Sequence, residues 1–237
     1  MQKLPNAAPL LSQVDHLVVA ASNLDEGVAW CETTLGVTPG PGGEHPLMGT
    51  HNRLCSIASA AFPRAYLEII AIKSGSPHTR KTGASRWFDL DKPGLQAQLA
   101  NTGPQLIHFV AHTANARAGV RALAALQIDR GELIEASRST PLGLLRWKIA
   151  VRADGQRLFY GALPTLIEWG DVHPATTMAA NGVHLQSLRA THPQPAQLLS
   201  ACSAIGLGRF DIAHDAPNLL ATLQTPRGLV TLESRGT

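Results

Sequence analysis

One short apolar stretch with a single histidine occurs three times in this chain, and this repetition limits the folds that are open to it. The copies read V-D-H-L-V-V-A-A (residues 14–21), L-I-H-F-V-A-H (106–112) and G-V-H-L-Q-S-L (182–188). Each copy is followed by a helical pattern and then by Gly- and Pro-broken strands, the last of which carries a lone glutamate. Such a period predicts an architecture built from copies of one supersecondary unit.

The histidine that opens each unit and the glutamate that closes it stand at similar separations. These separations are 52, 60 and 49 residues, for His16 and Glu68, His108 and Glu168, and His184 and Glu233. Each unit reads strand–helix–strand–strand–strand, which predicts an α+β protein with repeated βαβββ modules, a curved, antiparallel-rich mixed sheet and helices outside it. In the first unit, Asn23 or Asp25 is expected to cap the helix and Gly36 to end it.

The units divide the chain into two predicted parts. Residues 14–170 hold the first two modules (14–72 and 106–170), and residues 182–234 form a third, shorter βαβββ-like module. The connector 73–105 is polar, with a short helix expected around 95–100, and we expect it to be too polar to form a lid. The stretch 140–143 (T-P-L-G) is expected to be a turn between two strands of the second unit.

Composition narrows the class of protein and its partners. Of 237 residues, 44% are hydrophobic and 16% charged, as in an ordinary soluble domain, and a net charge of +3 without a dense basic stripe argues against nucleic acid. No apolar run is long enough for a membrane span, and the loose leader 1–13 does not resemble a signal peptide. Three cysteines without a C-x-x-C motif fit a reduced compartment. We therefore expect a cytoplasmic protein whose partner is a small molecule.

Three motifs resemble one known family. V-D-H-L-V-V-A-A, P-G-G-E-H-P-L-M-G-T-H-N-R-L and Y-L-E-I-I-A-I are similar to the glyoxalase-like domain group of the vicinal oxygen chelate superfamily. That superfamily includes glyoxalase I, extradiol dioxygenases and fosfomycin- and bleomycin-resistance proteins. The resemblance covers residues 14–170 well and the third unit more loosely. It implies two βαβββ modules that pair about a pseudo-two-fold axis and cup a cleft.

The resemblance also implies a metal site, with ligands from the first and last strand of each module. Those positions hold His16, Glu68, His108 and Glu168. Imidazole and carboxylate ligands suit Zn, Ni, Fe or Mn, which could act as a Lewis acid. A glutamate that leaves the metal, Glu68 or Glu168, could then serve as general base. The alternative is that each His and Glu pair only with each other as a remnant of duplication, and many superfamily members bind ligands without metal.

A second set of polar residues is expected to bind substrate. His51, Asn52 and Arg53 enter a strand from a Gly-rich loop, and His51 and Arg53 are expected to point into the cleft, with His51 also moving a proton. His112 shares a strand face with His108, and Trp169 is expected to form an apolar wall. His45 could close over the cleft, while Arg138 and Arg146 fit either anion contacts or a solvated face. No dinucleotide or P-loop fingerprint is present, so no nucleotide cofactor is expected.

These observations favour an enzyme of the lyase or isomerase type, dependent on a divalent metal, that acts on a small oxygenated metabolite. A metal-free binding protein of the bleomycin-resistance type and an extradiol-dioxygenase-like oxygenase are the alternatives. Two modules complete one cleft, so the third has a sheet face that something must cover. We expect the same unit of a second chain to cover it, in a homodimer.

Overall fold

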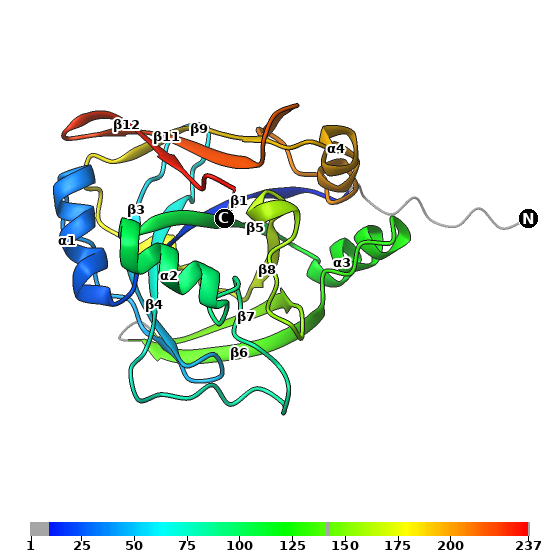
Figure 1. Cartoon of the computed structure of the whole chain (residues 1–237), viewed down its shortest axis with the longest axis horizontal. Helices are drawn as coiled ribbons and strands as arrows, with labels where there is room; N and C mark the ends of the chain where they lie inside the picture. Colours follow the sequence, from blue (N-terminus) through cyan, green and yellow to red (C-terminus); the bar gives the residue numbers. More distant parts are fainter. Residues whose placement is uncertain (1–9, 141–142, 237) are drawn as a thin grey trace, which may run out of the picture.

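The computed structural model describes residues 10–140 and 143–236, and its main feature is a curled eight-stranded sheet (Figure 1). The strand order is β2-β3-β4-β1-β5-β8-β7-β6, so the first module supplies one half and the second module the other. The elements of these modules are β1 (Ser12–Ala20), α1 (Leu24–Leu35), β2 (Glu44–His45), β3 (Thr50–Ser56), β4 (Tyr66–Ile72), β5 (Gln105–Thr113), α3 (Ala116–Ala125), β6 (Glu132–Thr140), β7 (Gly143–Val151) and β8 (Thr165–Trp169).

The predicted α+β fold with repeated βαβββ modules is therefore confirmed. In each module the first and last strands run parallel, β1 beside β4 and β5 beside β8, and the two modules join where β1 pairs antiparallel with β5. The side chain of Asn23 caps α1 by accepting a hydrogen bond from the backbone N–H of Glu26 (2.9 Å). Gly36 ends α1 with φ 78°, a left-handed conformation that favours glycine.

Strand β1 contains a bulge next to its histidine. Val14 and His16 stand opposite the consecutive residues Ala111 and Val110 of β5, so Asp15 is the extra residue. A bulge interrupts the strict alternation of side chains between the two faces. Asp15 and His16 are therefore neighbours in space as well as in sequence, with Oδ1 of Asp15 2.6 Å from Nδ1 of His16.

The connector covers the concave face of the sheet, contrary to the expectation that it is too polar for this role. Trp87, Phe88 and Leu90 are buried and pack with concave-face residues such as Val110 and Ile149. The expected short helix is α2 (Pro93–Thr102), whose buried leucines join the same cluster. A few apolar residues in an otherwise polar segment thus provide the buried surface.

Two hydrogen-bonded contacts hold this covering segment in place. Phe88 and Asp89 both have φ near +60° (59° and 60°), a region that is unfavourable for residues with a side chain. Arg157 forms an ion pair with Asp89 (Nε to Oδ2, 3.0 Å), and the backbone N–H of Asp89 donates to the carbonyl of Gly155 (3.0 Å). These contacts offset the local cost of the backbone conformation.

The third segment has the predicted element order but a different strand pairing. It consists of β9 (His184–Thr191), α4 (Pro195–Ala204), β10 (Asp211–Ala213), β11 (Asn218–Thr225) and β12 (Gly228–Glu233). The sheet order is β10-β9-β11-β12, so the closing strand β12 lies at an edge and β11 separates it from β9. His184 and Glu233 consequently do not meet across adjacent strands.

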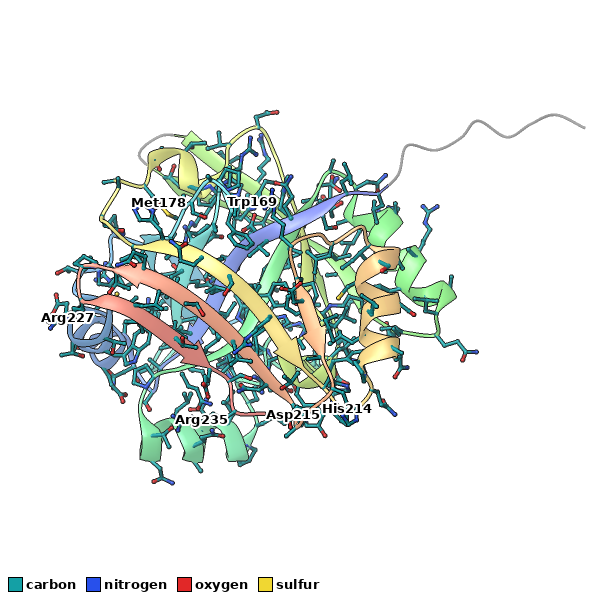
Figure 2. The ribbon with its side chains drawn as sticks, turned by 90° about the horizontal axis from the view of Figure 1, so that it is seen from above. Trp169, Met178, His214, Asp215, Arg227 and Arg235 are labelled. Carbon is teal, nitrogen blue, oxygen red and sulfur yellow. The ribbon has the colours of Figure 1, made fainter. Side chains whose placement is uncertain are left out.

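The apolar face of the third segment is buried within the same chain. Figure 2 looks onto this four-stranded sheet and shows it lying across β1, with Arg227 of the β11–β12 turn beside α1. Leu188 and Leu223 share one core with Leu17 and Phe109 of the central strands β1 and β5. The argument for a homodimer built on this face therefore loses its basis, because the convex side of the first two modules covers it.

Two remaining expectations concern chain segments and membranes. Residues 1–9 of the predicted leader and residues 141–142 of the predicted turn lie outside the described residues, while Thr140 and Gly143 on either side pair as neighbours in β6 and β7. Among the helices of residues 10–140 and 143–236, none has the length and apolar character needed to cross a membrane.

Candidate functional site

A small cavity opens on the concave face of the eight-stranded sheet, and several titratable side chains of the first module line it. Its volume is about 30 Å³, which is room for one water molecule. Strands of both modules and the covering segment contribute to its walls. The polar lining residues are His16, His45, Asn52, Tyr66, Glu68 and Arg138, and the aromatic ones are Trp87, Phe88, Trp147 and Trp169.

Asp15 lies next to this cavity and binds three side chains around it. Its carboxylate is fully buried and is bonded to Nδ1 of His16 (2.6 Å), Nε1 of Trp169 (2.9 Å) and Nε2 of His173 (2.9 Å). Burial alone would raise the pKa of Asp15, but the hydrogen bonds with His16 and His173 outweigh it and hold the pKa well below its usual range. Asp15 is therefore a fixed negative charge that orients three side chains.

His16 is held in one orientation by the groups around it. Because ionised Asp15 can only accept, Nδ1 of His16 carries a proton, and the other ring nitrogen, Nε2, faces Oε2 of Glu68 at 3.6 Å. The imidazole also stacks on the ring of Tyr66, with centroids 4.6 Å apart. The pKa of Tyr66 is raised well above its usual value by burial and by the neighbouring Asp15, so its hydroxyl stays protonated.

Glu68 is positioned from the neighbouring strand. Its Oε1 accepts a hydrogen bond from Nδ2 of Asn52 (2.6 Å), and Oδ1 of Asn52 accepts one from the backbone N–H of Gly43 (2.8 Å). The second bond fixes which way the Asn52 amide points, because only its oxygen can accept. Oε2 of Glu68 is then the oxygen that faces Nε2 of His16, at 3.6 Å.

Three further cavity residues add donors. Nη1 of Arg138 and Nε1 of Trp87 are buried and have no hydrogen-bond partner within the described part of the chain. Burial and the nearby Arg138 lower the pKa of His45 to about 3, so this imidazole is neutral at physiological pH. The cavity thus brings His16 and Glu68 together with two N–H groups that have no hydrogen-bond partner among the described residues.

His108 does not join this pair, which corrects the prediction of a shared cleft. It is completely buried; Nδ1 bonds to the carbonyl oxygen of Gly161 (2.8 Å), and Nε2 accepts from the backbone N–H of Thr165 (3.2 Å). Burial lowers the pKa of His108 well below its usual value. Both ring nitrogens are therefore used inside the protein, and His108 serves to connect β5 with β8.

Glu168 lies on the opposite face of the sheet, so its predicted role as ligand and base is also corrected. Ile167 and Trp169 line the cavity, and alternation turns Glu168 away from it. Its carboxylate binds Nζ of Lys148 (2.8 Å) and the backbone N–H of Ala116 at the start of α3 (2.9 Å). Burial would raise the pKa of Glu168, but these two contacts leave it lowered.

The H-N-R motif contributes its middle residue rather than the outer two. Asn52 and Leu54 line the cavity, so by alternation His51 and Arg53 lie on the other face of β3, where Arg53 is exposed. The prediction that His51 and Arg53 point into the cleft is therefore wrong, and the prediction for Asn52 agrees with its position.

The other two expected substrate residues differ in position. Trp169 lines the cavity as expected, and it also donates to Asp15. His112 is half-buried outside the cavity lining, where its ring meets that of His173 edge-on at 6.1 Å. Burial lowers the pKa of His112.

The donor set does not fit the divalent-metal centre implied by the family resemblance. Of the four expected ligands, only His16 and Glu68 meet, and the described residues contain no cluster of three or more His, Cys, Asp or Glu side chains suited to a metal. Two protein donors are fewer than the three or four that zinc and similar ions take from proteins. No chemical step is therefore assigned to a metal.

Sequence reasoning missed three residues of the site: Asp15, Tyr66 and His173. For Asp15 a signal was present, because only the first copy of the motif has an acidic residue before the histidine (V-D-H, against L-I-H and G-V-H). Strict alternation would have placed that carboxylate on the far face, and only the bulge in β1 brings it to His16. His173 follows β8 in a segment that carried no recognisable pattern.

Comparison with known proteins agrees with this architecture. The model of a family described as "Glyoxalase-like domain" matches residues 14–206, which span both modules and extend into the third segment. A hypothetical protein from Staphylococcus aureus has a similar structure, with 14% identity, a TM-score of 0.58, and coverage of 94% of this chain and 85% of the other. This likeness shows a shared fold.

Weaker structural matches include epimerases. Methylmalonyl-CoA epimerase from Mycobacterium tuberculosis is 17% identical, with a TM-score of 0.39 and coverage of 69% of this chain and 90% of its own. A Streptomyces coelicolor methylmalonyl-CoA epimerase variant in complex with 2-nitronate-propionyl-CoA is 18% identical, with a TM-score of 0.42 and coverage of 69% and 98%. These scores are too low to support an argument about this chain. No curated protein matches it.

Proposed function

The chain belongs to the glyoxalase-like domain family, within the vicinal oxygen chelate superfamily, and on this basis we propose that it is an enzyme of the isomerase or lyase type. Its reaction would move a proton on a small oxygenated substrate. The observation that carries the proposal is the buried pair of His16 and Glu68, whose facing atoms lie 3.6 Å apart in the wall of a cavity. Paired titratable groups of this kind are typical of acid–base sites.

The roles of the two residues follow from their partners. Asn52 engages one oxygen of Glu68, so the other, Oε2, is the oxygen proposed to take a proton from a substrate carbon beside a carbonyl group. Nε2 of His16 would accept that proton from Glu68. His16 would then donate it to a different atom of the substrate. Asp15 would stabilise the imidazolium that forms, because it is a buried negative charge bonded to Nδ1 of His16.

Charge that develops on the substrate oxygen needs a donor in the same cavity. Trp87 lines the cavity, and its buried Nε1 has no partner among the residues that the structure describes. An N–H group held in place before the reaction stabilises a developing oxyanion without having to reorganise. We assign this role to Trp87 within the proposal.

Solvent exchange tests the reaction class without knowledge of the natural substrate. Short aldehydes, ketones and 2-oxo acids are incubated in D₂O with the protein, and NMR follows the replacement of C–H by C–D beside the carbonyl. We expect catalysed exchange, and we expect Glu68→Gln and His16→Gln each to lower its rate by about 10²-fold or more. The matched control is Glu168→Gln, the corresponding glutamate of the second module, which should keep the wild-type rate. Exchange that survives Glu68→Gln would contradict the proposal.

A metal-free binding protein is the second candidate, and a specific observation favours it. An apolar cleft of about 520 Å³ adjoins the cavity, a size that suits a small ligand. The same experiment separates the two, because a binding protein would hold ligands without exchanging their protons. An extradiol-dioxygenase-like site needs two histidines and a glutamate around one ion, and His108 and Glu168 do not lie beside the His16–Glu68 pair.

A further inference from the structure

Arg138 lies at the junction of two hollows, and no described residue pairs with its charge. It lies on β6 of the second module and lines both the inner cavity, with His16 and Glu68, and the larger outer cleft. The side chain is half-buried, and its buried Nη1 has no hydrogen-bond partner among the described residues. Within residues 10–140 and 143–236 no carboxylate forms an ion pair with it. A guanidinium that is partly removed from water and left unpaired is costly, unless a ligand supplies the anion.

The Gly-rich loop is shaped to let Arg138 take this position. A Cβ atom added to Gly43 would overlap Nη1 of Arg138, and one added to Gly42 would overlap the backbone of Asn52. The backbone N–H of Gly43 is already used by Asn52, which orients Glu68. One loop thus sets both the acid–base pair and the guanidinium, so the two belong to one site although they come from different modules.

The outer cleft continues from the inner cavity and is largely apolar. The two hollows share Leu54, Arg138, Leu145 and Pro174 as lining residues, and the cleft has a volume of about 520 Å³. Val172 and Met178 add to its apolar wall, and the segment that carries them is fixed by the bond from His173 to Asp15. Figure 2 labels Met178, which lines the outer cleft, and Trp169, which lines the inner cavity.

We propose that the ligand of this site is an amphiphilic carboxylate: Arg138 binds its anionic group, an apolar chain occupies the outer cleft, and a small oxygenated end reaches the inner cavity. The placement of the reactive end at His16 and Glu68 rests on the proposed function. The recognition of anion and chain by Arg138 and the outer cleft does not depend on catalysis. Arginine suits a carboxylate because its planar fork can donate two parallel hydrogen bonds.

Calorimetric titration with three simple probes tests this recognition: hexanoate, its neutral analogue hexanamide, and acetate, which lacks the chain. Hexanoate should bind at least tenfold more tightly than either of the others, because it alone offers both the charge and the chain. Arg138→Met should weaken hexanoate binding at least tenfold and change hexanamide binding less than twofold. The matched control is Arg146→Met, since Arg146 is exposed on the opposite face of the neighbouring strand, and it should leave all three affinities unchanged.

Several results would overturn the inference. Equal affinities of the wild-type protein for hexanoate and hexanamide, or no binding of hexanoate, would do so without any variant. So would retained preference for the carboxylate in Arg138→Met, or an equal loss in Arg146→Met. Hexanoate binding that persists in Glu68→Gln while proton exchange is absent in the wild type would mean that the carboxylate site stands and the proposed reaction fails. Catalysed proton exchange in a protein that does not prefer hexanoate over hexanamide would mean that the proposed reaction stands and the carboxylate site fails.

Discussion

The first and second modules have the same sequence pattern, but they place their histidine and glutamate differently. In the first module His16 stands opposite Tyr66, two residues before Glu68, so histidine and glutamate share the concave face. In the second module Val110, two residues after His108, stands opposite Thr165, three residues before Glu168, so the offset between histidine and glutamate is five residues. The register thus differs by three residues, and an odd shift turns the glutamate to the other face.

The difference shows how two copies of one unit can share a fold and place the same residue types differently. The second module still pairs its first and last strands in parallel, but its histidine now bonds the backbone near β8 and its glutamate accepts from the first backbone N–H of α3. The second module contributes to the site in another way, through Arg138, Trp147 and Trp169 in the cavity wall. Acid–base chemistry would come from one half and ligand recognition largely from the other.

The largest effect on the free energy of unfolding is expected from Asp15→Ala, because only the first module has an aspartate before its histidine. Asp15→Ala leaves His16, Trp169 and His173 without their shared acceptor, and breaking a buried pair in this way costs about 3–5 kcal/mol. The free energy of unfolding, measured by urea titration, should fall by about that amount.

Asp15→Asn provides the control for shape, because it keeps the size of the side chain and removes its charge. We expect it to lower the rate of proton exchange even where the protein remains folded, since a neutral amide stabilises an imidazolium less well. Unchanged exchange in Asp15→Asn would mean that Asp15 only supports the fold, and the contrast between the modules would then lie in the register alone.

Substitutions of His108 and His16 are expected to differ in what they change, stability in the first case and exchange rate in the second. His108→Leu leaves the carbonyl of Gly161 and the N–H of Thr165 unpaired in the core, and each unsatisfied group costs about 1–3 kcal/mol. The variant should therefore unfold at lower urea concentration but keep the exchange rate per folded molecule. His16→Gln should show the opposite pattern, with the larger loss in rate. If His108→Leu abolished exchange in folded protein, the proposed division of roles between the modules would be wrong.

From the lowered pKa of His108 we expect the free energy of unfolding to depend on pH. Burial lowers the pKa of His108 far below its usual value, so between that value and about 6.5 the unfolded chain binds a proton that the folded protein does not. Stability should therefore rise with pH up to about 6.5, and this group should contribute a slope of about 1.4 kcal/mol per pH unit below it. Urea midpoints from pH 5 to 7.5 should show a shallower slope in His108→Leu than in the wild type, and equal slopes would contradict the assignment.

Local patterns predicted the order of strands and helices in each unit and the two ends of α1, because each of these depends on neighbours in sequence. Three features depend on long-range contacts and were not predictable in this way. The bulge at Asp15 arises where β1 meets β5, the face of Glu168 depends on the register of β5 and β8, and the burial of Trp87 depends on a concave sheet that only the complete fold provides. His51 and Arg53 were placed on the wrong face because alternation gives two faces and does not say which is inside.

The smallest effect is expected at Glu168, and it tests whether the second glutamate has become purely structural. Its carboxylate is partly exposed and bonds Lys148 and the first N–H of α3, contacts of a kind that stabilise proteins by about 0.5–1 kcal/mol each at most in such positions. Glu168→Gln should lower the free energy of unfolding by about 1 kcal/mol or less, and part of that loss should disappear at high salt, where exposed ion pairs are screened. Lys148→Met is the matched variant, because it removes the same ion pair and leaves the helix contact in place. A loss of stability in Glu168→Gln that exceeds the loss in Lys148→Met measures the helix contact, whereas a loss of several kcal/mol would contradict the assignment of two weak contacts to Glu168.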